Sequence, residues 1–165
     1  MPTLIEDSRQ QKSQHETKNA YWKSVGQHVV RSKLIAGDYM FVGGTVSVDT
    51  KRNLLELASN IDQQHDRFRR ELVNARECGI ELHFLVENAD GVRDLSTLAR
   101  WQNPRRFVNA KRGLRPPIDG RRMAKACATM EERYGCFFHF CTPEEAGARV
   151  LEILGKEAAD GGNPG

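Results

Sequence analysis

Tyr39-Met40-Phe41-Val42-Gly43-Gly44-Thr45-Val46-Ser47-Val48-Asp49-Thr50-Lys51 is the stretch that decides the fold, because two strand-like runs flank a pair of glycines. A Gly-Gly pair in this setting is typical of a β-hairpin with a two-residue turn. The turn fixes the register and places Tyr39 opposite Val48. One step further along the hairpin, Asp38 stands opposite Asp49.

Side chains alternate between the two faces of a strand, so the hairpin has two different faces. One face is apolar and predicts core, with Tyr39, Phe41, Val46 and Val48. The other face is mainly polar, with Asp38, Met40, Thr45, Ser47, Asp49 and Lys51.

The predicted Asp38/Asp49 pair points to a metal site. Like charges directly opposed across two strands are destabilising, because their β-carbons are only about 4.5–5.5 Å apart. Mg²⁺ would offset that repulsion, since it favours one or two carboxylates together with waters and phosphate oxygens. Lys51 projects from the same face and could help to activate a water and stabilise charge on a phosphate. Asp7 is a candidate further ligand, and Arg9 a candidate phosphate contact.

A plainer interpretation of Asp49-Thr50-Lys51 is a surface salt-bridge trio, and Glu16-Thr17-Lys18 has the same pattern. The hairpin register favours the metal site because it adds Asp38, although a β-bulge would shift that register. The residues alone leave both interpretations open.

The rest of the chain alternates strand-like and helix-like segments, which predicts an α/β domain with a mixed sheet flanked by helices. Further strands are expected at 3–6, 28–31, 80–86 and 136–140, and helices at 16–25, 53–61, 66–78, 94–101 and 121–134. A last helix is expected to follow a capping box formed by Thr142 and Glu145, and to end at Gly155. We expect one domain over residues 1–155, with a basic loop at 103–120 and a flexible tail at 156–165.

Composition adds three expectations. The 165-residue chain shows no secretory signal and no membrane-length apolar stretch. It has four cysteines without a CxxC pair, which indicates reduced thiols in a cytoplasmic protein. Cys136, His139 and Cys141 allow a zinc-thiolate site as an alternative, but the run around them is more typical of a buried strand.

The net charge is only +3, so any sign of nucleic-acid binding must come from local clustering. Such a cluster holds eight basic residues and one acid: Arg105, Arg106, Lys111, Arg112, Arg115, Arg121, Arg122 and Lys125, opposed by Asp119. It could neutralise several DNA phosphates, although a solvated loop is the alternative. Arg67 and Arg70 form a second basic patch on one helix face.

Several motifs resemble, in order and spacing, the XPF-type nuclease domain of the PD-(D/E)XK, or restriction-endonuclease-like, superfamily. They are Leu4-Ile5-Glu6-Asp7-Ser8-Arg9, Leu34-Ile35-Ala36-Gly37-Asp38-Tyr39, Val48-Asp49-Thr50-Lys51, Asp66-Arg67-Phe68 and Leu82-His83-Phe84-Leu85-Val86-Glu87. The resemblance covers residues 3–90. The remainder resembles short, stand-alone versions from bacteria and their phages.

The resemblance implies a role for each matching residue. Asp38 and Asp49 would be metal ligands, Lys51 the catalytic lysine and Asp7 a supporting acid, with Arg9 and Arg67 near the phosphate. It also implies a restriction-endonuclease-like fold, Mg²⁺ (or Mn²⁺) as cofactor, branched or duplex DNA as partner, and a location in a bacterial or phage-infected cell. A homodimer is plausible.

Three positions depart from the family pattern. Thr50 replaces an arginine, Gln10 replaces a glutamate, and Glu71 stands where a glutamine is usual. None of these changes removes Asp38, Asp49 or Lys51.

The matching motifs together predict a metal-dependent DNA endonuclease that could be structure-specific and act in repair, recombination or phage DNA processing. The alternative is a non-catalytic DNA-binding or partner-docking module that retains the nuclease fold.

Overall fold

The computed structural model describes residues 1–10 and 15–160, with side chains as far as Lys156. The strands are β1 Leu4–Asp7, β2 Val29–Ser32, β3 Tyr39–Phe41, β4 Val46–Lys51, β5 Glu81–Glu87 and β6 Phe137–Cys141. The helices are α1 Glu16–Ser24, α2 Leu54–Asp62, α3 His65–Glu77, α4 Leu95–Leu98, α5 Arg105–Lys111, α6 Gly120–Tyr134 and α7 Ala146–Asp160. Of the expected flexible tail, residues 161–165 lie outside the described residues.

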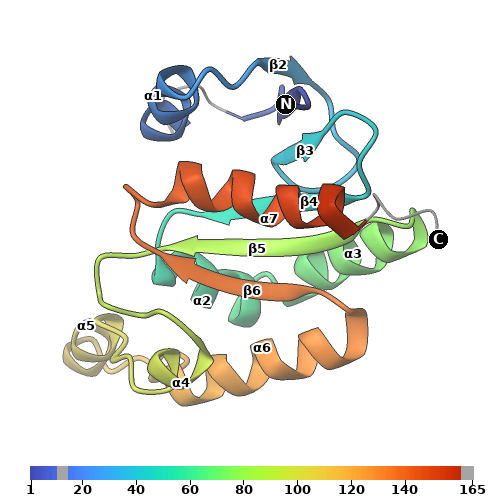
Figure 1. Cartoon of the computed structure of the whole chain (residues 1–165). Helices are drawn as coiled ribbons and strands as arrows, with labels where there is room; N and C mark the ends of the chain where they lie inside the picture. Colours follow the sequence, from blue (N-terminus) through green and yellow to red (C-terminus); the bar gives the residue numbers. More distant parts are fainter. Residues whose placement is uncertain (11–14, 161–165) are drawn as a thin grey trace.

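The six strands form one mixed sheet in the order β2-β1-β3-β4-β5-β6 (Figure 1). The β3 strand runs antiparallel to both of its neighbours, whereas β4, β5 and β6 are parallel to one another. Parallel neighbours need crossover helices, and these helices cover the faces of the sheet. The predicted α/β class with a mixed sheet is confirmed.

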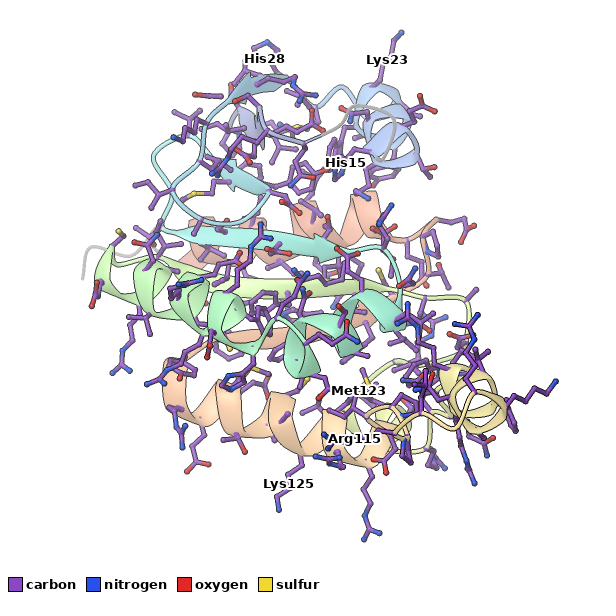
Figure 2. All side chains as sticks on the ribbon, turned by 180° about the vertical axis from the view of Figure 1, so that it is seen from behind. His15, Lys23, His28, Arg115, Met123 and Lys125 are labelled. Carbon is purple, nitrogen blue, oxygen red and sulfur yellow. The ribbon has the colours of Figure 1, made fainter. Side chains whose placement is uncertain are left out.

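The two faces of the sheet pack against different helices. On one face, Leu82, Phe84 and Val86 of β5 join a core cluster with residues of α2, α3 and α6. On the other face, Val48 and Leu85 join a second cluster with residues of α1 and α7. Figure 2 shows Lys23 of α1 and Lys125 of α6 at opposite ends of the molecule, with the sheet between them.

The predicted hairpin register is confirmed over the paired residues, because Tyr39 pairs with Val48 and Met40 with Ser47. The predicted two-residue Gly-Gly turn is wrong. The amide of Gly44 donates to the carbonyl of Phe41 at 3.0 Å, so the turn is centred one residue earlier. Gly43 supplies the positive φ of 78° that a side chain would disfavour at the third position of such a turn.

Two expectations about the second half of the chain need correction. Residues 103–120 are not all loop, because they contain α5. Pro104 stands at the start of that helix, where a missing N–H costs nothing, and no glycine or proline interrupts the seven residues that follow. The last helix also continues past Gly155 to Asp160. Its buried residues, among them Val150, Ile153 and Leu154, offset the cost of about 1 kcal/mol of an interior glycine.

In the part of the chain that is described, no helix combines the length and the apolar character needed to span a membrane.

Candidate active site

A cleft of about 710 Å³ opens between the β1 and β4 strand ends on one side and helices α2 and α3 on the other. It brings together seven residues that the sequence singled out: Asp7, Arg9, Asp38, Asp49, Lys51, Arg67 and Arg70. These residues come from four separate segments of the chain. The cleft is therefore a product of the fold and not of any one motif.

Asp38 is held by hydrogen bonds to Val48 and Thr50, the residues that precede and follow Asp49 in β4. The regular β3–β4 ladder ends at Tyr39, and the Asp38 amide donates to the carbonyl of Val48 at 2.8 Å. The Asp38 Oδ2 atom accepts from both the amide of Thr50, at 2.8 Å, and its hydroxyl, at 2.9 Å. Both aspartates are buried. Asp38 therefore reaches the neighbourhood of Asp49 by a local departure from the ladder, and not as a regular ladder pair.

Gly37 makes that departure possible. Its φ is 74°, a conformation that side chains disfavour. A β-carbon at Gly37 would also lie 2.0 Å from the Ser47 hydroxyl oxygen, which donates to the carbonyl of Ala36 at 2.7 Å. Only glycine lets the loop approach β4 closely enough to place Asp38 in the cleft.

The charges of the cleft act on each other at short range. Burial, and then the Asp49 carboxylate, raise the pKa of Asp38. The Lys51 ammonium lies 3.0 Å from Asp49 Oδ1 and within 5.6 Å of the centres of the Phe68 and Phe84 rings. Burial by itself would lower the pKa of Lys51, but the neighbouring carboxylates raise it, so the side chain stays cationic.

Glu71 is a further acidic group of the cleft, and the sequence had shown it only as a departure from the family pattern. It lies on α3, and burial followed by the nearby Asp49 raises its pKa. The available signal was helical spacing: Arg67, Glu71 and Asn74 form a polar stripe beside the apolar stripe that contains Phe68.

Gln10 and His15 extend the site in a way that sequence reasoning missed. The Gln10 amide donates to Asp38 Oδ1, and Gln10 Oε1 lies 2.9 Å from His15 Nε2. The other ring nitrogen of His15 contacts the Tyr39 hydroxyl. Burial, followed by nearby cations, lowers the pKa of His15 to about 4, so the ring is neutral. A neutral ring that donates from Nε2 accepts from Tyr39, and every donation in the chain Tyr39–His15–Gln10–Asp38 then points toward Asp38.

Asp7 and Arg9 hold the loop that leads to Asp38. The Asp7 carboxylate accepts from Arg9 Nε and from the amide of Leu34, both at 3.0 Å. Arg9 donates in turn to the carbonyl of Leu34 at 2.9 Å, while much of its side chain stays exposed to the cleft. These bonds give Asp7 a local structural role.

The acidic pair fits a small divalent cation better than it fits zinc. Within the described residues, no three or more His, Cys, Asp or Glu side chains form a group that could hold a metal ion. Two carboxylates are nevertheless a sufficient protein contribution for Mg²⁺, which keeps several waters.

The alternative zinc site at Cys136, His139 and Cys141 loses its support. His139 Nε2 lies 2.8 Å from His83 Nδ1, and burial raises the pKa of the Cys136 and Cys141 thiols to about 12, so that they do not readily become the thiolates that zinc needs.

The other predicted DNA contacts lie outside this cleft. Arg105, Arg112, Arg115 and Arg122 line a second cavity, between α2 and α5. Arg106 and Arg121 line a third, next to Trp101. Lys111 is exposed on α5.

Comparison with known proteins adds a likeness to solved structures. No protein-family model matches the chain, and no curated protein matches its sequence. The chain is similar to the structure of XPF from Aeropyrum pernix in complex with DNA, with a TM-score of 0.63 and 19% identity. The match covers 98% of this chain and 66% of that chain, just under two thirds of its length. This likeness shows an XPF-like, restriction-endonuclease-like fold.

Proposed function

We propose that this protein is a DNA endonuclease that uses Mg²⁺ or Mn²⁺ to hydrolyse phosphodiester bonds. The observation that carries the proposal is the buried pair Asp38 and Asp49, with the Lys51 ammonium 3.0 Å from one of the carboxylates, in a cleft whose rim carries arginines. Buried carboxylates that repel each other are costly unless a cation or a proton joins them. The XPF-like fold supports this assignment.

Five residues of the cleft act directly in the proposed reaction. Asp38 and Asp49 hold the cation, which when bound supplies Lewis-acid charge to the scissile phosphate. Lys51, fixed as a cation, stabilises the negative charge that develops on the phosphate. Arg9 and Arg67 bind phosphate oxygens from the rim.

Other residues keep Asp38 in place. Thr50 and Gln10 donate to its two oxygens, and His15 orients Gln10. Asp7 supports the loop that carries Asp38 through its bond to the amide of Leu34. Ligands held in this way lose little freedom on metal binding, which is the general role of groups around a metal site.

A cleavage assay tests the proposal. End-labelled single-stranded, duplex, flapped and four-way-junction DNA is incubated with Mg²⁺, Mn²⁺ or EDTA. The variants Asp49→Ala and Lys51→Ala should lose metal-dependent cutting. Their controls, Asp66→Ala and Lys23→Ala, make the same chemical changes at exposed positions on α3 and α1 and should cut like the wild type. Equal cutting by Asp49→Ala and the wild type would contradict the assignment.

One observation favours a non-catalytic DNA-binding module as the second candidate. Thr50, in place of the family's arginine, bonds to Asp38 and offers no cationic group to the cleft. Thermal unfolding with and without Mg²⁺ or Mn²⁺ separates the candidates. A ligand at about 100 times its Kd stabilises the native state by roughly 2.7 kcal/mol. A metal-induced shift that Asp49→Ala abolishes supports the nuclease, whereas DNA binding without metal binding or cutting supports the module.

A further inference from the structure

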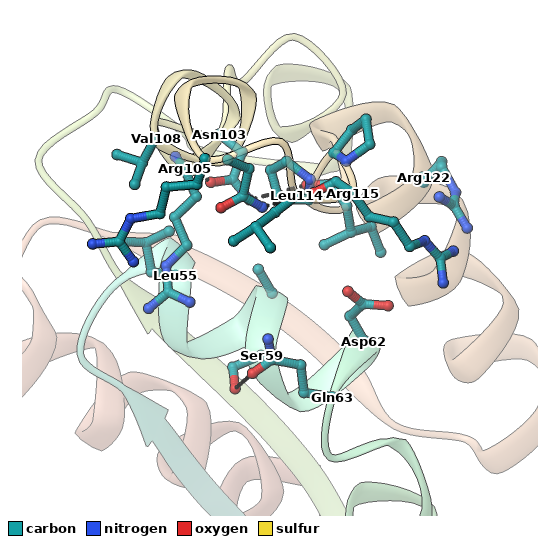
Figure 3. A pocket seen from close by; sticks show the side chains of 16 residues that line it. Leu55, Ser59, Asp62, Gln63, Asn103, Arg105, Val108, Leu114, Arg115 and Arg122 are labelled. Carbon is teal, nitrogen blue, oxygen red and sulfur yellow. Dashed lines mark hydrogen bonds between the residues drawn. The ribbon is translucent and has the colours of Figure 1, made fainter.

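A second cavity, of about 860 Å³, lies between α2 and the segment 103–118 (Figure 3). Its lining includes four arginines, Arg105, Arg112, Arg115 and Arg122. In the described part of the chain, none of these four guanidinium groups lies within ion-pair distance of a carboxylate. The one acidic residue of the lining is Asp62 of α2, which Figure 3 shows below the Arg115 and Arg122 side chains. The cavity therefore carries an excess of positive charge.

Apolar side chains from α2 and from the segment 103–118 also line the same cavity, and we call them its apolar floor. Leu55, Ala58, Val108, Leu114, Pro116, Pro117 and Ile118 all contribute to it. Val108 is 50% exposed and Leu114 56% exposed, although both are large apolar side chains. Exposed apolar groups surrounded by polar ones mark binding surfaces. Unpaired arginines beside an open apolar surface suit a ligand that has both anionic groups and flat apolar faces.

The wall opposite α2 is held in shape before any ligand arrives. The buried Asn103 donates to the carbonyl of Ile118 at 3.0 Å and accepts from the amide of Arg105 at 3.0 Å. Asn109 donates to the carbonyl of Arg115 at 2.8 Å. These bonds join the two ends of the segment and anchor α5, so little ordering is needed on binding.

The cavity and the candidate active site are separated by the width of a single helix. On α2, Glu56 and Asn60 line the active-site cleft, whereas Leu55 and Ser59 line the arginine cavity. A helix with its side chains is about 10–12 Å across. One strand of DNA advances about 3.4 Å per nucleotide along a duplex. At that duplex spacing about three nucleotides would span α2 from one cavity to the other, and an unpaired strand, which can extend further per nucleotide, would need no more than that.

We propose that this arginine cavity binds a single strand of nucleic acid, with phosphates on the guanidinium groups and one or more bases against the apolar floor. Unpaired bases expose apolar faces and stack on guanidinium planes, whereas the bases of a duplex are already stacked inside it. A concave site of this volume admits a few nucleotides but not a duplex. The strand's continuation to Asp38 and Asp49 rests on the proposed nuclease function; its binding in the cavity does not.

Fluorescence anisotropy in EDTA tests the proposal without cleavage. The probes are a short labelled oligothymidylate and a labelled blunt duplex, each titrated over a range of salt concentrations. The test variant is Arg105→Gln/Arg115→Gln, in which both changed side chains are exposed. The matched control, Arg93→Gln/Arg149→Gln, removes two arginines that pair with Glu145 and Glu152 elsewhere on the surface. Circular dichroism and thermal unfolding establish that both variants are folded.

We expect the test variant to lower the salt dependence of oligothymidylate binding. Each lost phosphate contact reduces the slope of log K against log salt by about 0.7 for a single strand, so two lost contacts reduce it by about 1.4. Duplex binding should change less, and the control should resemble the wild type. Asp62→Asn, which removes the acid of the cavity, should strengthen oligothymidylate binding.

Two outcomes would overturn the proposal. Unchanged oligothymidylate affinity and salt slope in the test variant would remove the cavity as a binding site. Equal losses for oligothymidylate and duplex would remove the preference for a single strand. Failure of the nuclease proposal gives a different pattern, in which no DNA is cut but oligothymidylate binding still depends on Arg105 and Arg115.

Discussion

Lys18→Met probes a buried ion pair that joins α1 to the end of β5. Lys18 Nζ lies 2.8 Å from Glu87 Oε2, and the two side chains are only 4% and 9% exposed. Burial raises the pKa of Glu87, and Lys18 opposes that rise. Methionine leaves the Glu87 charge buried without its partner, which typically costs 3–5 kcal/mol. For a chain of this size, that loss corresponds to a fall in Tm of about 10 °C.

The assay is urea unfolding at neutral pH of the wild type, Lys18→Met, Glu87→Gln and the double variant, arranged as a double-mutant cycle. The double variant should recover much of the lost stability, because it leaves no uncompensated charge. The pKa of Glu87 should rise further in Lys18→Met. That variant should therefore lose more stability relative to the wild type as the pH increases, since the carboxyl must ionise while buried. A loss below about 1 kcal/mol in Lys18→Met, or a double variant no more stable than the singles, would refute the reasoning.

Three further predictions concern the site. Thr50→Val keeps the side-chain shape but removes the hydroxyl bond to Asp38. Because a hydrogen bond to a charged group is worth about 1.5–3 kcal/mol, single-turnover cutting should slow by about tenfold or more. A rate within twofold of the wild type would contradict this role of Thr50. Gly37→Ala places a side chain at a positive φ and makes it overlap with Ser47. Urea unfolding should therefore show a free energy of unfolding lower by about 2–4 kcal/mol, whereas unchanged stability would show that the loop relaxes easily. The pKa of His15 is lowered to about 4 in the folded chain, so the unfolded chain binds an extra proton between about pH 6.5 and 4. Stability should therefore fall by about 3 kcal/mol as the pH drops through that window, and an equally steep fall in His15→Gln would assign it to other groups.

The sequence alone determined the elements that depend on local patterns. The glycine pair between two strand-like runs predicted the pairing of Tyr39 with Val48, and alternation predicted the faces of β4, because side chains of a strand alternate with a period of two. Strands and helices with clear periodicity were found where they were expected, with ends that differ by a few residues. The exact turn and α5 were not predicted from the sequence. The turn is centred on Val42 and Gly43 instead of on both glycines, and Pro104 stands at the start of a helix instead of marking a loop.

The candidate site divides in the same way. Asp38, Asp49 and Lys51 could be grouped from the sequence, because a hairpin makes their proximity a local matter. Glu71, Gln10 and His15 could not, since each comes from a segment whose position relative to β4 is set by packing. The two cavities on either side of α2 could not be predicted from the sequence either, because they are formed by packing. A basic cluster in the sequence shows how much charge is present, but only the tertiary structure, which places α5 across a cavity from α2, decides which arginines line that cavity and where it lies relative to the acidic pair.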